Sequence, residues 1–224
     1  MNPLFKAASR NALRTGVILF AFTVVATVLL VFTFNRTQPS IERSQQAAKL
    51  SLLSQVLPRT LYDNDLLSTQ QRVPPDALLG SHQASAMWIA RRGTRVTGVI
   101  LEAIAPDGYS GDIHLLIGID VNGVATGVRV TSHRETPGLG DYIDRHKSPW
   151  IEQFVGKSLT APASRLWAVT KDGGAFDARA GATITPRAVV KAVRSALDYF
   201  SRHRPAIVAS PIAHEAPLVK EKNT

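Results

Sequence analysis

The sequence contains no cysteine among its 224 residues. Without a thiol, the chain cannot form disulfides, thiolate zinc sites, cysteine-ligated iron–sulfur clusters or a cysteine nucleophile. Charged residues are also sparse, at 19%, whereas hydrophobic residues make up 45%. This balance is typical of a chain that buries a sizeable core, so disorder is excluded as a general description.

Acidic residues are fewer than basic ones, 17 against 26, which gives a formal net charge of +9. Four of the basic residues, and none of the acidic ones, lie within residues 1–36. The rest of the chain has 22 basic and 17 acidic residues, a net charge of only +5. So small an excess gives little support to nucleic-acid binding, and we expect no nucleic-acid partner.

A run of 20 residues without any charge extends over 15–34. A helix of this length spans the ~30 Å hydrocarbon core of a bilayer. Lys6, Arg10 and Arg14 precede it, which predicts a cytoplasmic segment 1–14 and places residues from 37 onward across the membrane. A cleavable signal peptide is the alternative, but its apolar core is shorter, roughly 7–15 residues, and is followed by small residues. We therefore predict a retained transmembrane helix over 15–34.

The next segment, 35–84, has the composition of a helical stalk followed by a loop. Apolar positions over 41–57 predict a helix that continues from the anchor and ends at Pro58. Residues 68–84 are polar and contain two adjacent prolines, which favours a loop.

Alternating apolar residues then predict strands, separated by turn signals such as Asn122-Gly123. The predicted strands cover 87–91, 94–105, 112–120, 123–133 and 166–170, with a short helix over 149–155. A final helix is expected over 185–202, with Thr185 as N-cap and Pro186 at the first helical position. The pattern indicates an α+β fold: one N-terminal transmembrane helix, then a mixed domain over 85–202 with a mostly antiparallel sheet. A mobile tail is expected over 203–224.

Several familiar motifs are incomplete. Residues 155–158 end like a phosphate-binding P-loop, but Ile151 stands where the leading glycine belongs. Residues 138–140 begin like a dinucleotide fingerprint, but Ile143 occupies the third glycine position. The six histidines never occur at metal-ligand spacing. A conventional hydrolase or a metalloenzyme therefore has no support.

Two glycine-containing segments are candidates for a binding site. Residues 135–141 hold a proline and two glycines, so their backbone can approach a ligand closely and donate from its amides; a simple turn explains the same composition. Residues 177–185 place small side chains and the Thr183 hydroxyl just before a helix. The amides of a helix N-terminus stabilise phosphate, and Arg187 is placed to add a contact, although a capped helix after a small-residue turn would look alike.

Residues 181–185 (GATIT) resemble the flavinylation motif of FMN-binding domains, in which the threonine after Gly-Ala forms a phosphoester with FMN. With Asp177 they are similar to the pattern read by flavin transferases, except that Ala180 replaces the usual Ser or Thr. The segments 105–111, 135–140 and 171–174 resemble, in the same order, the G subunit of the Rnf (Rsx) electron-transport complex. The C subunit of the sodium-pumping NADH:quinone oxidoreductase is a more distant relative. The resemblance covers the anchor and roughly residues 85–202.

This resemblance implies FMN held covalently through its phosphate on Thr183, placed there by a flavin transferase that uses FAD and releases AMP. No catalytic residue and no metal site are implied, because the isoalloxazine carries the electron chemistry. The cofactor-binding residues implied are Thr183, Gly181, Ala182, Thr185, Glu135, Thr136, Pro137, Gly138, Leu139 and Gly140.

The resemblance also implies a place in the cell. The chain would be a single-pass protein of the bacterial inner membrane with a periplasmic FMN domain, assembled with the other membrane subunits of the complex. That complex would link electron transfer between ferredoxin and NAD(H) to Na⁺ or H⁺ movement, or reduce a redox sensor. A cofactor-free, membrane-tethered binding module and a flavoenzyme acting alone on an extracytoplasmic substrate are the alternatives.

Overall fold

The computed structural model describes residues 3–210 of the chain, and side chains over 13–38 and 41–210. Most of the predicted tail, residues 211–224, lies outside the described residues. The described chain divides into two compact units, the first ending at Ala48 and the second beginning at Lys49.

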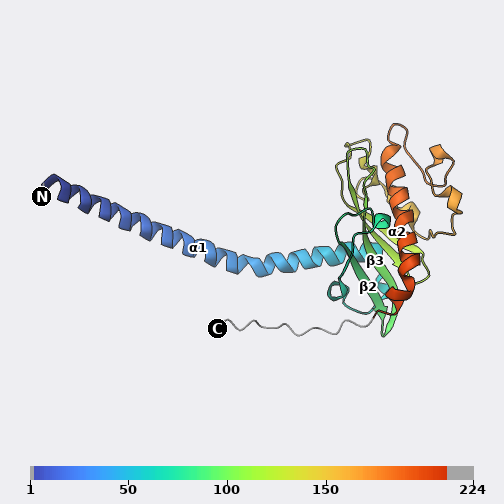
Figure 1. Cartoon of the computed structure of the whole chain (residues 1–224), viewed down its shortest axis with the longest axis horizontal. Coiled ribbons are helices and arrows are strands. Elements are labelled where there is room, and N and C mark those ends of the chain that lie inside the picture. The colour runs from blue at the N-terminus through green and yellow to red at the C-terminus, as the bar shows by residue number, and fades with distance from the viewer. Residues whose placement is uncertain (1–2, 211–224) are drawn as a thin grey trace. The chain divides into compact units, whose positions relative to one another are not determined.

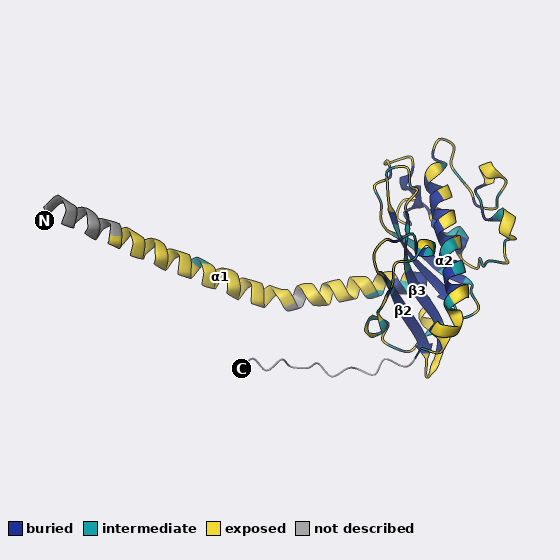
Figure 2. Cartoon of the chain, viewed as in Figure 1, coloured by how far each residue is buried: buried dark blue, intermediate teal, exposed yellow. Residues whose placement is uncertain are grey.

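Helix α1 (Pro3–Val56) forms the first unit up to Ala48, and its last turns, from Lys49 on, belong to the second unit. Its large apolar side chains between Leu13 and Phe34 are exposed, Phe20 by 71% (Figure 2). An unbroken apolar surface of this length suits a lipid environment rather than water. Among the described residues, α1 is the one helix long and apolar enough to cross a membrane. The helix predicted over 41–57 is its continuation.

The second unit contains a five-stranded sheet in the order of the sequence, each strand antiparallel to the next (Figure 1). The strands are β1 (Gln71–Val73), β2 (Ser85–Arg92), β3 (Arg95–Ala105), β4 (Ile113–Asp120) and β5 (Ala125–Ser132). Along the central strands β3 and β4, consecutive side chains point to opposite faces of the sheet, and most of them are buried on both faces. Each face of the sheet is therefore covered by other parts of the domain. The predicted α+β class with a mostly antiparallel sheet is confirmed.

Helix α2 (Ile184–Val208) covers the first face of the sheet. Its buried side carries Val189, Val193 and Leu197, spaced every four residues, against strand residues such as Leu101 and Leu115. In Figure 2 the buried residues of α2 are dark blue and lie toward the sheet, whereas its exposed residues are yellow and face away from it. The face is the main core of the domain.

The end of α1 covers part of the second face. Gly118 on β4 and Gly127 on β5 are direct cross-strand partners, and together they leave a gap in the sheet surface. A Cβ on Gly118 would lie 2.1 Å from the Val56 carbonyl oxygen, and one on Gly127 would lie 2.8 Å from Val56 Cα. Thr126 Oγ1 donates to the same Val56 oxygen at 2.6 Å. The helix end therefore rests directly on the strand backbones.

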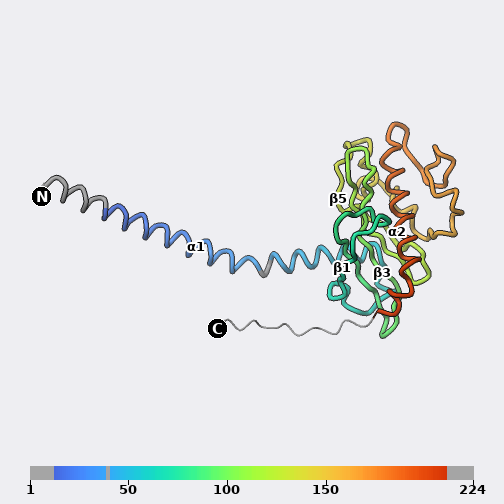
Figure 3. Tube along the Cα trace, viewed as in Figure 1, coloured from blue at the N-terminus to red at the C-terminus, as the bar shows by residue number. Residues whose placement is uncertain are grey.

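Residues 133–183 connect β5 to α2 through short 3₁₀ helices and turns and contain no strand. In Figure 3 this connection is the part of the trace coloured from yellow to orange. The predicted short helix is present as a 3₁₀ helix, Pro149–Phe154. Aromatic rings with centroid distances of 4.9–6.5 Å form the core of this connection. They are Tyr142, Trp150, Phe154, Trp167 and Phe176.

One strand prediction and one loop prediction are wrong. Residues 166–170 form no strand, and Val169 makes only an isolated bridge to Phe176. The backbone hydrogen bonds here join residues close in sequence; the Gly174 N–H, for example, donates to the Val169 carbonyl oxygen at 3.0 Å. The segment predicted as loop, 68–84, contains β1, which pairs with β2 at the edge of the sheet.

The final helix also differs from its prediction. It begins at Ile184 with Thr183, not Thr185, as N-cap, so Pro186 is the third helical residue. It continues past residue 202 to Val208 and includes Pro205. Ile207 is buried in the main core, which accounts for the added turn.

Candidate functional site

The two glycine-containing segments meet around one cavity of about 320 Å³. This volume is at the lower end of the range for small-molecule pockets, roughly 300–1,000 Å³. Of the predicted site residues, Pro137 and Gly138 do not line it, whereas Tyr109 and Ile184 line it without having been predicted. The lining residues are Tyr109, Glu135, Thr136, Leu139, Gly140, Gly181, Ala182, Thr183, Ile184 and Thr185.

One wall of the cavity is the turn that precedes α2. Gly181 adopts φ +83°, a conformation that favours glycine. The buried Tyr142 hydroxyl donates to the Ala182 carbonyl oxygen and accepts from the Arg179 N–H, both at 3.2 Å. Burial raises the pKa of Tyr142, so its phenol stays protonated and remains a donor at neutral pH. The turn is thus held on both sides of Gly181 by one side chain.

Thr183 lies at the end of this turn, as the N-cap of α2. Its side chain is half-buried and makes no capping hydrogen bond, although its carbonyl accepts from the Arg187 N–H at 3.2 Å. The first N–H groups of a helix have no partner within it and carry a partial positive charge. A hydroxyl without a capping bond therefore lines the cavity next to a helix end that stabilises anions.

The opposite wall is formed by the 135–140 loop. Glu135 is only 4% exposed; its Oε2 accepts from Thr185 Oγ1 at 2.5 Å, and its Oε1 accepts from the Ser110 N–H at 3.1 Å. A Cβ on Gly140 would lie 2.7 Å from that Oε2, so glycine is required there for space. This glutamate joins the loop to α2 and to the turn after β3.

The rim of the cavity is apolar. Tyr109, Leu139 and Ile184 are 67%, 52% and 46% exposed, and all three line it. Large apolar side chains in contact with water gather at binding sites more often than elsewhere on a surface. A flat, largely apolar ring system with a phosphate tail fits this arrangement, with the rings against the rim and the tail at Thr183. The residues present therefore fit FMN.

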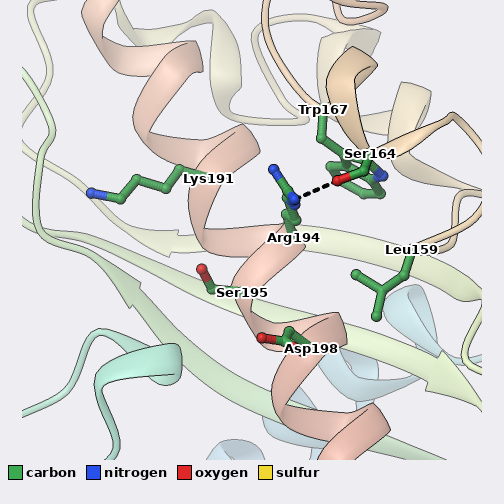
Figure 4. A pocket seen from close by; sticks show the side chains of 7 residues that line it. All are labelled: Leu159, Ser164, Trp167, Lys191, Arg194, Ser195 and Asp198. Atoms are coloured by element: carbon green, nitrogen blue, oxygen red, sulfur yellow. Dashed lines mark hydrogen bonds between the residues drawn. The ribbon is translucent and has the colours of Figure 1, made fainter.

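A second, larger hollow of about 480 Å³ lies on the outer side of α2 (Figure 4). Its Arg194 donates to Ser164 Oγ at 2.6 Å, and Lys191 and Asp198 also line it. None of the predicted site residues lines it. The cavity at Thr183 is therefore the better candidate despite its smaller volume.

Known proteins align with this sequence over most of its length. The G subunit of the ion-translocating oxidoreductase complex of Aliivibrio fischeri (strain MJ11) is 43% identical over 199 residues, which cover 89% of this chain and 95% of the relative. The corresponding G subunit of Pseudomonas aeruginosa (strain UCBPP-PA14) is 45% identical over 203 residues, 91% of this chain and 95% of the relative. The chain belongs to this G-subunit family. It is therefore a component of an ion-translocating oxidoreductase complex, with other subunits as partners.

Two family models match parts of this G subunit. The FMN-binding domain model matches residues 108–198, and the RnfG N-terminal region model matches residues 1–56. The first range includes Tyr109, the 135–140 loop and Thr183, so the whole cavity lies in an FMN-binding domain. The crystal structure of NqrC from Shewanella oneidensis aligns with a TM-score of 0.44 and 20% identity, over 66% of this chain and 76% of that chain.

Some residues of the G-subunit site had no clear signal in the sequence. Tyr109 stands within the 105–111 segment, but its exposure at the cavity depends on the fold. Arg187, considered as a phosphate contact, is paired instead with Asp172, its Nε 2.7 Å and its Nη2 2.8 Å from the two carboxylate oxygens. These hydrogen bonds hold the pKa of Asp172 below its ordinary value.

Replacing Tyr142 with phenylalanine is expected to loosen the turn before Thr183, because both hydrogen bonds of the hydroxyl are lost. At roughly 0.5–1.5 kcal/mol for each bond, the free energy of unfolding should fall by about 1–3 kcal/mol. Denaturant unfolding of the full chain in detergent measures it. Tyr199→Phe, in another buried tyrosine, is the control: an equal loss in both variants would contradict a special role for Tyr142.

Proposed function

We propose that this G subunit is an electron-transfer subunit that carries FMN as a phosphoester on Thr183 Oγ1. The proposal rests on a comparison of the hydrogen bonds and positions of the three threonine hydroxyls around the cavity. The Thr185 hydroxyl is buried and donates to Glu135, and Thr136 belongs to the opposite loop. Thr183 combines a hydroxyl without a capping bond with a place at the N-terminus of α2.

The proposed roles of the other residues follow from their positions. The amides at the start of α2 would hold the phosphate. Tyr109, Leu139 and Ile184 would pack against the rings, and the 135–140 loop would limit the access of water from the other side. Bound FMN supplies the electron chemistry, whereas the protein sets its position, exposure and electrostatic surroundings. A covalent tether also prevents loss of the cofactor between electron transfers.

We further propose the topology and partners of the chain. Residues 15–34 would cross the bacterial inner membrane with residues 1–14 in the cytoplasm, as the basic residues before the apolar run favour. The FMN domain, 85–202, would then be periplasmic. A flavin transferase would mature it, and the complex would couple electron transfer between ferredoxin and NAD(H) to Na⁺ or H⁺ movement. The family resemblance of the motifs supports these finer assignments.

The test is to express the full chain with and without a flavin transferase and to denature it. With the transferase, we expect a flavin-fluorescent band on a denaturing gel and a mass gain of one FMN less one water. Trypsin cleaves after Arg179 and Arg187, so the modified peptide should be 180–187. Because this peptide also contains Thr185, its fragmentation must place the adduct on Thr183. A colourless denatured chain, or an adduct elsewhere, contradicts the proposal.

A further inference from the structure

Glu135 is a buried carboxylate that joins three segments at the cavity. Its Oε2 accepts from Thr185 in the first turn of α2, and its Oε1 accepts from the Ser110 N–H in the turn between β3 and β4. Both oxygens therefore accept from fixed donors, an arrangement that suits the ionised form. The carboxylate has no freedom to turn away from the cavity that it lines.

The surroundings of this carboxylate leave little space for a counter-ion. A Cβ on Gly108 would lie 2.9 Å from Oε1, and one on Gly140 would lie 2.7 Å from Oε2. Glycine at both positions lets the two backbones close over the carboxylate. Among residues with described side chains, none of the ion pairs includes Glu135. The two neutral donors spread its charge without cancelling it.

We propose that Glu135 lowers the reduction potential of the FMN, an inference that rests on the proposed function. A fixed negative charge at the wall of a cavity opposes any gain of negative charge inside it, and the effect is larger where water is excluded. A flavin held between Glu135 and Thr183 therefore takes up electrons less readily than the same flavin without that charge. Glu135 is in this sense a residue that tunes the potential, in addition to holding the loop.

Two substitutions separate the charge of Glu135 from its role as a structural link. Glu135→Gln keeps the shape but removes the charge. Its single amide oxygen can accept from the Ser110 N–H while its NH2 group donates to the Thr185 hydroxyl, which then acts as the acceptor. Thr185→Val keeps the charge but removes one of its donors, so the charge is less compensated. The charge proposal predicts opposite shifts, a higher potential for Glu135→Gln and a lower one for Thr185→Val. A site that merely loosens would shift both potentials in the same direction.

Asp141 provides the matched control. It is also a buried carboxylate next to the same loop, and its Oδ1 accepts from the Gly138 N–H at 2.8 Å, but it does not line the cavity. Asp141→Asn should therefore disturb the loop as much as Glu135→Gln does while shifting the potential much less. Equal shifts in these two variants would overturn the proposal.

The experiment is a redox titration of the covalent flavin, followed by absorbance, in full-length variants matured with the transferase and purified in detergent. For Glu135→Gln we expect the equilibrium for electron uptake to change about tenfold or more in favour of reduction. For a two-electron couple, tenfold corresponds to a rise of about 30 mV. An unchanged potential in a flavin-loaded Glu135→Gln protein overturns the proposal. The circular dichroism of each variant reports its fold independently of the flavin.

The outcomes also distinguish this proposal from the one on which it rests. If the wild-type chain acquires no covalent flavin, the proposed function fails, and the role of Glu135 falls with it. If the wild type is loaded but the potentials do not move as described, only the role of Glu135 fails. If Glu135→Gln does not fold, Thr185→Val decides alone: a lower potential supports the proposal, and an unchanged or higher one overturns it.

Discussion

Replacing Thr183 with alanine is expected to abolish covalent flavin while leaving the fold intact. The Thr183 hydroxyl makes no capping hydrogen bond, so its removal breaks no such contact within the protein. Loss of an N-cap threonine costs about 0.5–2 kcal/mol where the cap bond exists, and the cost here should lie at or below the lower end. Loss of the adduct without loss of stability would identify the hydroxyl as an attachment point.

The measurement is in-gel flavin fluorescence of the denatured full chain together with its melting temperature. Thr183→Ser, which keeps a hydroxyl at the same position, should retain some of the adduct. Thr136→Ala removes a hydroxyl from the opposite wall of the same cavity and should retain the adduct in full. Fluorescence that persists in Thr183→Ala would show that the attachment site lies elsewhere.

Replacing Gly118 with valine should separate the end of α1 from the sheet. The new Cβ would lie 2.1 Å from the Val56 carbonyl oxygen and 2.6 Å from Thr126 Oγ1, so the helix end, the strand or both must move. Overpacking in a core costs typically 1–3 kcal/mol. Because the clash here is with backbone, we expect a loss of about 3 kcal/mol or more.

Denaturant unfolding of the full chain in detergent measures this loss, and limited proteolysis near residue 57 reports the separation directly. His114→Val is the matched control, since His114 lies on the same strand and the same sheet face but beyond the end of α1. Thr126→Val, which removes only the hydrogen bond to Val56, should cost about 0.5–1.5 kcal/mol. Wild-type stability in Gly118→Val would mean that the helix end is not seated as described.

The regular part of the fold could be predicted because its signals are local. Alternating apolar residues predicted β2 to β5, and Asn122-Gly123 predicted the turn between β4 and β5. Strand β1 has only three residues and is followed by two prolines, too short a segment to show a period of two. Residues 166–170 are apolar because they cross the core, with Trp167 and Val169 buried, and not because they join a sheet.

The site could be predicted only where a single segment carries the information. Glycines and small residues indicated the two loops, but nothing in either loop indicates that the Thr185 hydroxyl bonds to Glu135, 50 residues away. The N-cap of α2 was predicted wrongly for a different reason. Two threonines precede Pro186, and the rule that proline favours the first helical position selected Thr185 as the N-cap. The N-cap is instead Thr183, two residues earlier, and the helix begins at Ile184.

The simple strand order has a consequence for the maturation of the protein. Each strand pairs with its neighbour in sequence, so the sheet is dominated by local contacts, which form early and quickly in folding. The cavity instead joins Tyr109 to Thr183, residues far apart in the chain, and is complete only after α2 has packed on a finished sheet. We therefore expect Thr183 to be synthesised before its pocket exists, so that the proposed flavin attachment would report a correctly folded domain.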